Sequence, residues 1–167
     1  MSNRFKKIFL AATVVVPFLV YCLYYYGMMV KNAPYKFADF QSIVFKYGKG
    51  DSLVNTYNSK TGEYQYMTKS GELIKKHLRV SKDELLYLHR KASDLGFWNF
   101  PVDETKRDTT IKVVSPRYFI QFNYTKKSKT VLYDDAFDGD PSLKDANQRL
   151  IKEIQKVLDE AEIHQQK

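Results

Sequence analysis

An uncharged run from Ile8 to Val30, close to the N-terminus, constrains this chain more than any other feature of its sequence. At about 1.5 Å per residue, a helix over this run is roughly 34 Å long, and the hydrocarbon core of a bilayer is about 30 Å thick. Pro17 lies in the middle of the run, a position that membrane helices tolerate. The run therefore predicts a transmembrane helix at residues 8–30.

The residues on either side of this run predict its orientation. Positive charge favours the cytoplasmic side of a membrane, and tyrosine favours the membrane–water interface. The residues concerned are Arg4, Lys6 and Lys7 before the run, and Tyr21, Tyr24, Tyr25 and Tyr26 near its far end. We therefore expect residues 1–7 to form a cytoplasmic tail, and the chain beyond the helix to lie in the periplasm or the extracellular space.

Two alternatives to an uncleaved anchor, a cleaved signal peptide and a lipoprotein signal, have sequence features that this chain lacks. A cleaved signal peptide has an apolar stretch of roughly 7–15 residues and a small-residue cleavage site, whereas this run is longer and no such site follows it. A lipoprotein signal has a small residue before the lipidated cysteine, but Tyr21 precedes Cys22. Because Cys22 is the single cysteine, the rest of the chain has neither an internal disulfide nor a cysteine-based zinc site.

After a short linker at residues 31–39, residues 40–167 are predicted to form one α+β domain. Short runs with period-two alternation and glycine-containing breaks predict an antiparallel meander, then a helix, a second group of strands and a final helix. The expected strands are Phe40–Tyr47, Ser52–Tyr57, Glu63–Thr68 and Glu72–Val80, then Thr109–Val114, Tyr118–Tyr124 and Thr130–Tyr133. We expect one antiparallel sheet of about seven strands with both helices on one face, which buries the apolar stripe of each helix.

Capping residues mark the ends of the two predicted helices of the domain. Ser81 and Glu84 form an S-x-x-E capping box at the start of the first helix. Gly96 suits the left-handed position that follows the helix end. We expect the last helix to begin with Asp140 as N-cap and Pro141 at the first helical position.

The aspartates between residues 134 and 145 partly resemble a calcium-binding loop. Asp134, Asp138 and Asp140 fall at ligand positions one, five and seven, but Ala136 stands at position three, where an oxygen ligand is needed. Asp145 replaces the usual bidentate glutamate at position twelve. We favour the alternative, a turn and helix N-cap with acids at a helix N-terminus, and expect no cofactor.

Two groups of residues are candidates for contact with a partner. Trp98 and Phe100 belong to the most concentrated apolar group outside a regular element, which either plugs the core or forms an exposed recognition patch. Lys126, Lys127 and Lys129 are predicted to form a solvated hairpin tip that discourages edge pairing. A sharper interpretation of this tip is contact with lipid head groups or with an acidic partner.

Catalytic and nucleic-acid signals are weak in this sequence. His77, His89 and His164 have no partner at the spacing of a metal or triad motif, and there is no G-x-S-x-G. The formal net charge is +8, but the basic residues are not concentrated as in nucleic-acid-binding proteins. We therefore expect neither an enzyme nor a nucleic-acid partner, although a spatial triad can escape sequence reading.

The segment from Val80 to Leu85, which leads from strands into a capped helix, and the helix exit at Leu95-Gly96-Phe97-Trp98 carry a resemblance. In outline, residues 40–160 resemble small uncharacterised membrane-anchored or lipoprotein-like ectodomains of Bacteroidetes. The resemblance implies an envelope protein and carries over no functional residue. Cys22 departs from the pattern because it lacks a lipobox.

These observations lead to one hypothesis and two alternatives. The leading hypothesis is a membrane-anchored extracytoplasmic domain that binds another protein in or near the membrane, as an accessory subunit of a membrane complex. One alternative is a small-ligand-binding or enzymatic domain with its site on the open face of the sheet. The other is a membrane-tethered immunity or inhibitor protein.

Overall fold

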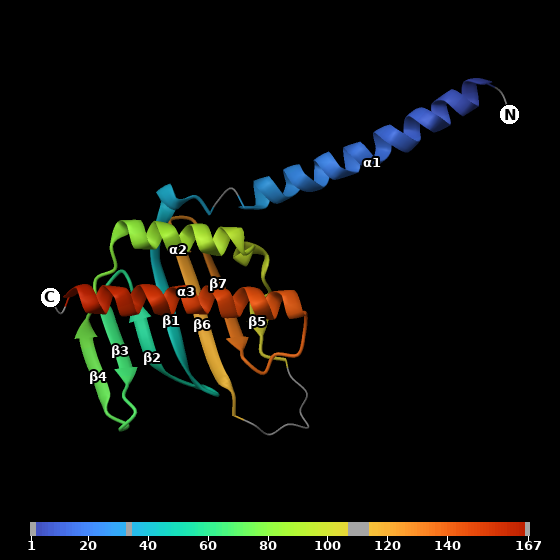
Figure 1. Ribbon diagram of the computed structural model, residues 1–167. Coiled ribbons are helices and arrows are strands. Elements are labelled where there is room, and N and C mark those ends of the chain that lie inside the picture. Colours follow the sequence, from blue (N-terminus) through green and yellow to red (C-terminus); the bar gives the residue numbers. More distant parts are fainter. Residues whose placement is uncertain (1–2, 33–34, 107–113, 166–167) are drawn as a thin grey trace. The chain divides into compact units, whose positions relative to one another are not determined.

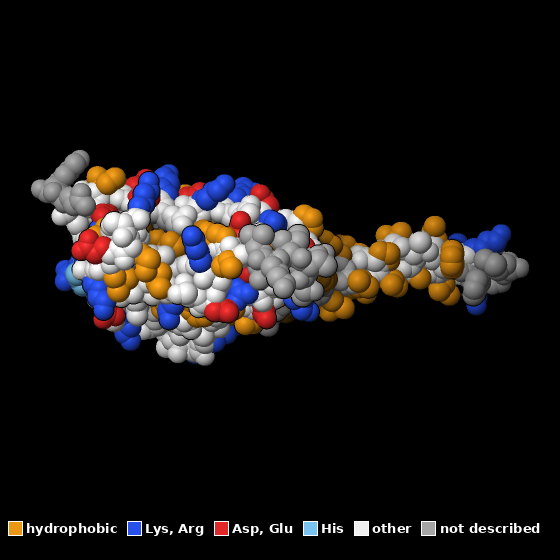
Figure 2. All heavy atoms as spheres, turned by 90° about the horizontal axis from the view of Figure 1, so that it is seen from below, with side chains coloured by type: hydrophobic (Ala, Val, Ile, Leu, Met, Phe, Trp, Pro, Cys, Tyr) orange, Lys and Arg blue, Asp and Glu red, His pale blue; other side chains and the backbone are white. Residues whose placement is uncertain are grey.

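The computed structural model describes residues 3–32, 35–106 and 114–165, and the chain divides into two compact units, residues 1–35 and 36–167. The first unit is the helix α1 (Asn3–Asn32). Its stretch Lys6–Met29 is long and apolar enough to cross a membrane, although a signal sequence has the same character. Figure 2 shows apolar side chains along α1 and basic side chains at its N-terminal end.

The second unit is built on a seven-stranded sheet in the order β4-β3-β2-β1-β6-β7-β5 (Figure 1). Strands β1 to β4 form the predicted antiparallel meander, and β6 pairs antiparallel with both β1 and β7. The α+β class predicted from the sequence is confirmed. The strands are β1 Phe40–Lys49, β2 Ser52–Asn58, β3 Glu63–Met67, β4 Leu73–His77, β5 Asp103–Glu104, β6 Pro116–Tyr124 and β7 Ser128–Asp134.

One edge of the sheet differs from the prediction. The two-residue strand β5 pairs parallel with β7, so the expectation of a purely antiparallel sheet is wrong here. No strand was predicted at Asp103 and Glu104, because two residues are too few to show any periodicity. The strand predicted at residues 109–114 lies, up to residue 113, outside the described residues.

The helices α2 (Lys82–Asp94) and α3 (Pro141–Gln165) lie on the same face of the sheet, as predicted (Figure 1). Successive side chains of a strand point to opposite faces of the sheet. Most of the side chains that point toward α2 and α3 are buried and apolar. Phe45 of β1, Phe122 of β6 and Leu150 of α3 are fully buried between the two layers. Neither α2 nor α3 covers the opposite face of the sheet, which we call the open face.

The predicted helix caps are confirmed. Ser81 Oγ accepts a hydrogen bond from the Glu84 backbone N–H at 3.2 Å, and Glu84 Oε2 accepts one from the Ser81 N–H at 2.7 Å. Gly96 adopts φ +75°, in the left-handed region that a glycine enters without strain. Asp140 Oδ1 accepts a hydrogen bond from the Ser142 N–H at 2.8 Å, so α3 begins where the sequence predicted.

The connection between the two units is shorter than the predicted linker. The helix α1 continues to Asn32, and the 3₁₀ turn η1 (Phe37–Asp39) already belongs to the folded domain. The Phe37 ring lies 5.5 Å from the His89 ring of α2, measured between centroids. The Asp39 carbonyl oxygen accepts hydrogen bonds from the N–H and the hydroxyl group of Thr125, at 2.9 and 3.2 Å.

Candidate functional site

The structure places Trp98 and Phe100 in the core of the domain. Each side chain is 6% exposed. The Trp98 ring lies 5.4 Å from Phe122 of β6 and 5.8 Å from Tyr124, measured between centroids, and 5.5 Å from His89 of α2. The sequence left a core plug and a recognition patch open, and this burial favours the plug.

The three candidate lysines do not share one environment. Lys126 is exposed at the β6–β7 turn and Lys127 is half-buried. Lys129 is only 9% exposed and lies on the same face of β7 as the buried Val131, and its Nζ donates a hydrogen bond to the Phe100 carbonyl oxygen. Because β7 begins at Ser128, earlier than predicted, Lys129 is a strand residue with a structural contact and not part of an exposed tip.

The carboxylate of Asp134, at the end of β7, makes hydrogen bonds and an ion pair within the domain. Asp134 is fully buried, and its Oδ1 accepts hydrogen bonds from the Ser115 hydroxyl and, at 2.9 Å, from the Ala136 N–H. Its Oδ2 pairs with Arg117 Nε at 2.7 Å. Burial alone would raise the pKa of Asp134, but the hydrogen bonds from Arg117, Ser115 and Ala136 hold it below its ordinary value.

The other members of the weak calcium candidate are also placed differently from a metal site. Asp140 caps α3, and hydrogen bonds from the Ser142 hydroxyl and N–H lower the pKa of Asp140. Asp138 is exposed. Within the described part of the chain, no group of three or more His, Cys, Asp or Glu side chains lies close enough to hold a metal ion. In the structure Asp134 is ion-paired with Arg117, and Asp140 caps α3.

A second buried carboxyl group, that of Glu104, was not predicted from the sequence. Glu104 of β5 is fully buried and accepts a hydrogen bond from Asn147 Nδ2 of α3, which is also fully buried. Burial raises the pKa of Glu104 to about 7, although the Asn147 amide and the charge of Lys129 act in the opposite direction. Among the described residues, Glu104 Oε1 and Asn147 Oδ1 have no hydrogen-bond partner. A proton on Glu104 would supply the missing donor, which favours a neutral acid in the folded domain.

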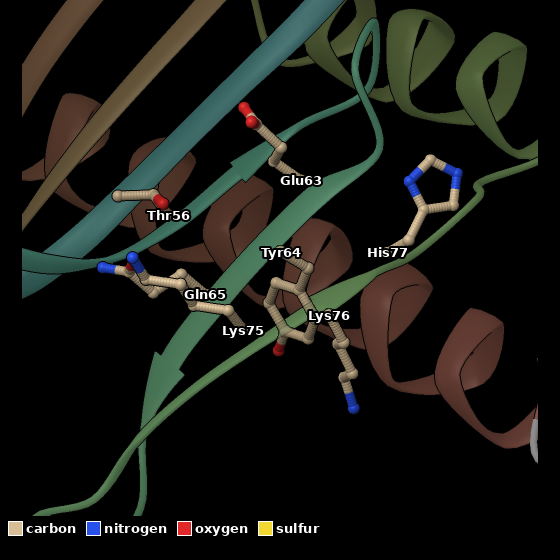
Figure 3. A pocket seen from close by; sticks show the side chains of 7 residues that line it. All are labelled: Thr56, Glu63, Tyr64, Gln65, Lys75, Lys76 and His77. Atoms are coloured by element: carbon tan, nitrogen blue, oxygen red, sulfur yellow. The ribbon is translucent and has the colours of Figure 1, made fainter.

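A shallow depression of about 450 Å³ lies at the β3–β4 edge (Figure 3). Strand alternation directs Glu63 and His77 to the open face and Tyr64 and Lys76 to the face that packs against the helices, as Figure 3 shows. Lys76 pairs with Glu162 of α3. The lining residues are Thr56, Glu63, Tyr64, Gln65, Lys75, Lys76 and His77.

A second depression, of about 440 Å³, lies beside the start of β1. Its polar side chains carry amide, hydroxyl and ammonium groups, and no carboxylate stands among the described residues that line it. Asn123 Nδ2 donates to Ser42 Oγ at 3.0 Å and Gln41 Nε2 donates to Thr125 Oγ1 at 3.3 Å, so the side chains hold one another in place. The lining residues are Gln41, Ser42, Val44, Asn58, Lys60, Asn123, Tyr124 and Thr125.

Comparisons with known proteins leave the function to be argued from the structure. No family model matches the chain, and no curated protein or solved structure matches it either. The resemblance to anchored ectodomains of Bacteroidetes therefore stays a prediction.

Proposed function

We propose that this chain is a single-pass membrane protein whose α+β domain lies outside the cytoplasm and binds another protein in or near the membrane. The observation that carries the proposal is α1, an exposed apolar helix of membrane-spanning length with basic residues at its N-terminal end. Its length and the lack of a small-residue site after it favour an uncleaved anchor over a cleaved signal. The basic end favours a cytoplasmic N-terminus.

The short connection between the units supports a partner close to the bilayer. Only residues 33–36 separate the end of α1 from η1. At up to about 3.6 Å per residue, the chain from Asn32 to Phe37 spans at most roughly 18 Å. A domain on such a tether stays close to the end of α1 and, if α1 spans the membrane, close to the other proteins of that membrane.

The open face of the sheet supports a protein partner more than a small ligand. Phe119 of β6 and Leu132 of β7 are neighbours on this face and are half-buried, while Met67 and Leu73 are 46% and 44% exposed. Phe119 with Leu132, and Met67 with Leu73, are neighbouring apolar pairs that could form the buried core of a protein interface, with polar side chains at its rim. Small-molecule sites are concave and enclose most of their ligand, whereas the β3–β4 depression is shallow.

Affinity purification of the tagged full-length chain from its own membranes, after gentle cross-linking, tests this proposal. We expect a reproducible membrane-protein partner that is lost when Phe119→Glu and Met67→Glu are combined on the open face. The matched control is Ile163→Glu, which alters an exposed apolar residue of α3 and should keep the partner. Purification of the chain without any partner, or with a partner that the open-face variant retains, would contradict the proposal. Either result would favour the alternative of a small ligand.

A further inference from the structure

We infer that the end of the domain at which the chain enters from α1 binds the anionic head groups of membrane phospholipids. This inference rests on the proposed membrane anchor and adds the surface through which the domain meets the bilayer. We call this region the entry end. It comprises the entry segment 36–41, the β2–β3 turn at residues 58–62 and the β6–β7 turn at residues 124–128.

Hydrogen bonds join the β6–β7 turn to the entry segment, and the β2–β3 turn to Ile43 of β1 just after it. Thr125 of the β6–β7 turn donates twice to the Asp39 carbonyl oxygen, as described above. The Ser59 N–H of the β2–β3 turn donates to the Ile43 carbonyl oxygen at 3.0 Å, and Ser59 Oγ accepts from the Ile43 N–H at 2.9 Å. Both turns therefore lie at the same end of the sheet as Lys36. The β1–β2 and β3–β4 turns lie at the other end (Figure 1).

The entry end carries more positive than negative charge. Lys36, Lys60 and Lys126 are exposed, and an exposed ammonium group near an anionic surface is attracted to it. Glu63 accepts a hydrogen bond from the Thr61 hydroxyl at 3.1 Å. The charged side chains of the entry segment, the two turns and the start of β3 are Lys36, Lys60, Lys126 and Lys127 against Asp39 and Glu63.

The depression beside the start of β1, which we call the donor-lined depression, offers hydrogen bonds in addition to the attraction between charges. A lipid phosphate group offers only hydrogen-bond acceptors, and the depression presents the Lys60 ammonium with amide and hydroxyl groups. The bonds from Asn123 to Ser42 and from Gln41 to Thr125 fix these groups before any ligand binds. A carboxylate, which would repel phosphate, is missing from its described lining.

The short chain connection to α1 favours a lipid head group over free phosphate as the ligand. The entry segment is joined to α1 by a tether of at most roughly 18 Å. If α1 spans the membrane, the entry end therefore lies within reach of the head groups, which are the most concentrated anionic phosphates there. The depression and the lysines then act on the same surface.

Hydrogen–deuterium exchange of the full-length chain in nanodiscs tests the inference. We compare discs of phosphatidylcholine alone with discs that also contain phosphatidylglycerol. In the anionic discs, the amides of residues 58–62 and 124–128 should exchange about fivefold more slowly, the equivalent of roughly one lysine at an anionic surface. The slowing should disappear in the double variant Lys60→Glu, Lys126→Glu.

The matched control makes the same charge change at the opposite end of the sheet. Lys49 and Lys69 are exposed beside the β1–β2 and β3–β4 turns, so Lys49→Glu, Lys69→Glu should keep the slowing. Equal exchange in both discs, or slowing that survives in the Lys60, Lys126 variant, would overturn the inference. Slowing by inorganic phosphate in phosphatidylcholine discs to the same extent would overturn the lipid as its source.

These outcomes are separate from a failure of the proposed anchor. A chain that does not stay with the disc contradicts the anchor itself. A chain that stays, but exchanges alike in both lipid mixtures, contradicts lipid binding alone.

Discussion

The helix α1 and the folded domain use apolar side chains in opposite ways. Along α1 large apolar side chains stand exposed, with Leu23 at 72%, whereas Phe45 and Phe122 in the domain are fully buried. Exposed apolar surface on this scale is unfavourable in water and favourable in a hydrocarbon environment. The difference teaches that α1 has the character of a membrane span or a signal sequence, whereas the domain buries its apolar side chains in a core of its own.

The largest expected effect tests this contrast with the same substitution in each unit. Phe45→Ala removes a fully buried ring and should lower the free energy of unfolding of the domain by about 3–5 kcal/mol. Phe18→Ala in α1 removes an exposed ring and should change it by less than about 0.5 kcal/mol. Urea unfolding in detergent, followed by Trp98 fluorescence, measures both. Equal effects would mean that α1 packs as part of the domain.

The next prediction concerns the charged pair inside the domain. Arg117→Met leaves the buried Asp134 carboxylate without its cation and should cost about 3 kcal/mol. Because the folded-state pKa of Asp134 is lowered, its contribution is present above the ordinary pKa of an aspartate and is lost as the pH falls through the folded pKa. Unfolding of the variant and the parent at neutral pH measures the cost. Arg117→Met combined with Asp134→Leu should recover part of the stability, and no recovery would contradict this explanation.

Glu104 should show the opposite dependence on pH. Its folded-state pKa is raised to about 7, above the ordinary value of 4.5, so its contribution is complete below pH 4.5 and is lost as the pH rises through 7. The loss is at most about 3 kcal/mol. Glu104→Gln should remove this part of the pH dependence, while Asp103→Asn, an exposed neighbour, should keep it. Identical pH profiles for Glu104→Gln and the parent would contradict the assignment.

The smallest effect concerns the ends of the helices. In water α2 needs its capping box, so Ser81→Ala should cost about 1 kcal/mol. Ser93→Ala, an exposed change in the last turn of α2, is the matched control and should cost less. By contrast, α1 has no acidic residue in its first turn. Thermal unfolding compares the two variants, and a larger loss in Ser93→Ala would refute the role of the cap.

Local sequence signals predicted most of the fold. Ser81 with Glu84, Gly96 and Asp140 mark helix ends through contacts with residues only a few positions away, and each was recovered. The alternation in β6 likewise reports which side chains face the core. Such signals suffice because the physical cause lies within the segment itself.

Contacts between distant segments were not predictable in this way. The pairing of β5 with β7, the hydrogen bond from Lys129 to Phe100 and the bond from Asn147 to Glu104 each join residues far apart in the chain. The donor-lined depression gathers side chains from several strands and turns. No spacing within one segment indicates these arrangements. Of the proposed site, Lys126 and Lys127 were therefore identified from the sequence, but Lys36, Lys60 and the depression were missed.

Carbonate extraction of native membranes containing the full-length chain tests the central claim most directly. The chain should remain in the membrane pellet at its full mass, with its N-terminus intact and its domain degraded when protease is added from outside the cytoplasm. Release of the intact chain as a soluble protein would contradict the account. A shortened chain that has lost α1 would equally contradict it, because α1 would then be a cleaved signal and not an anchor.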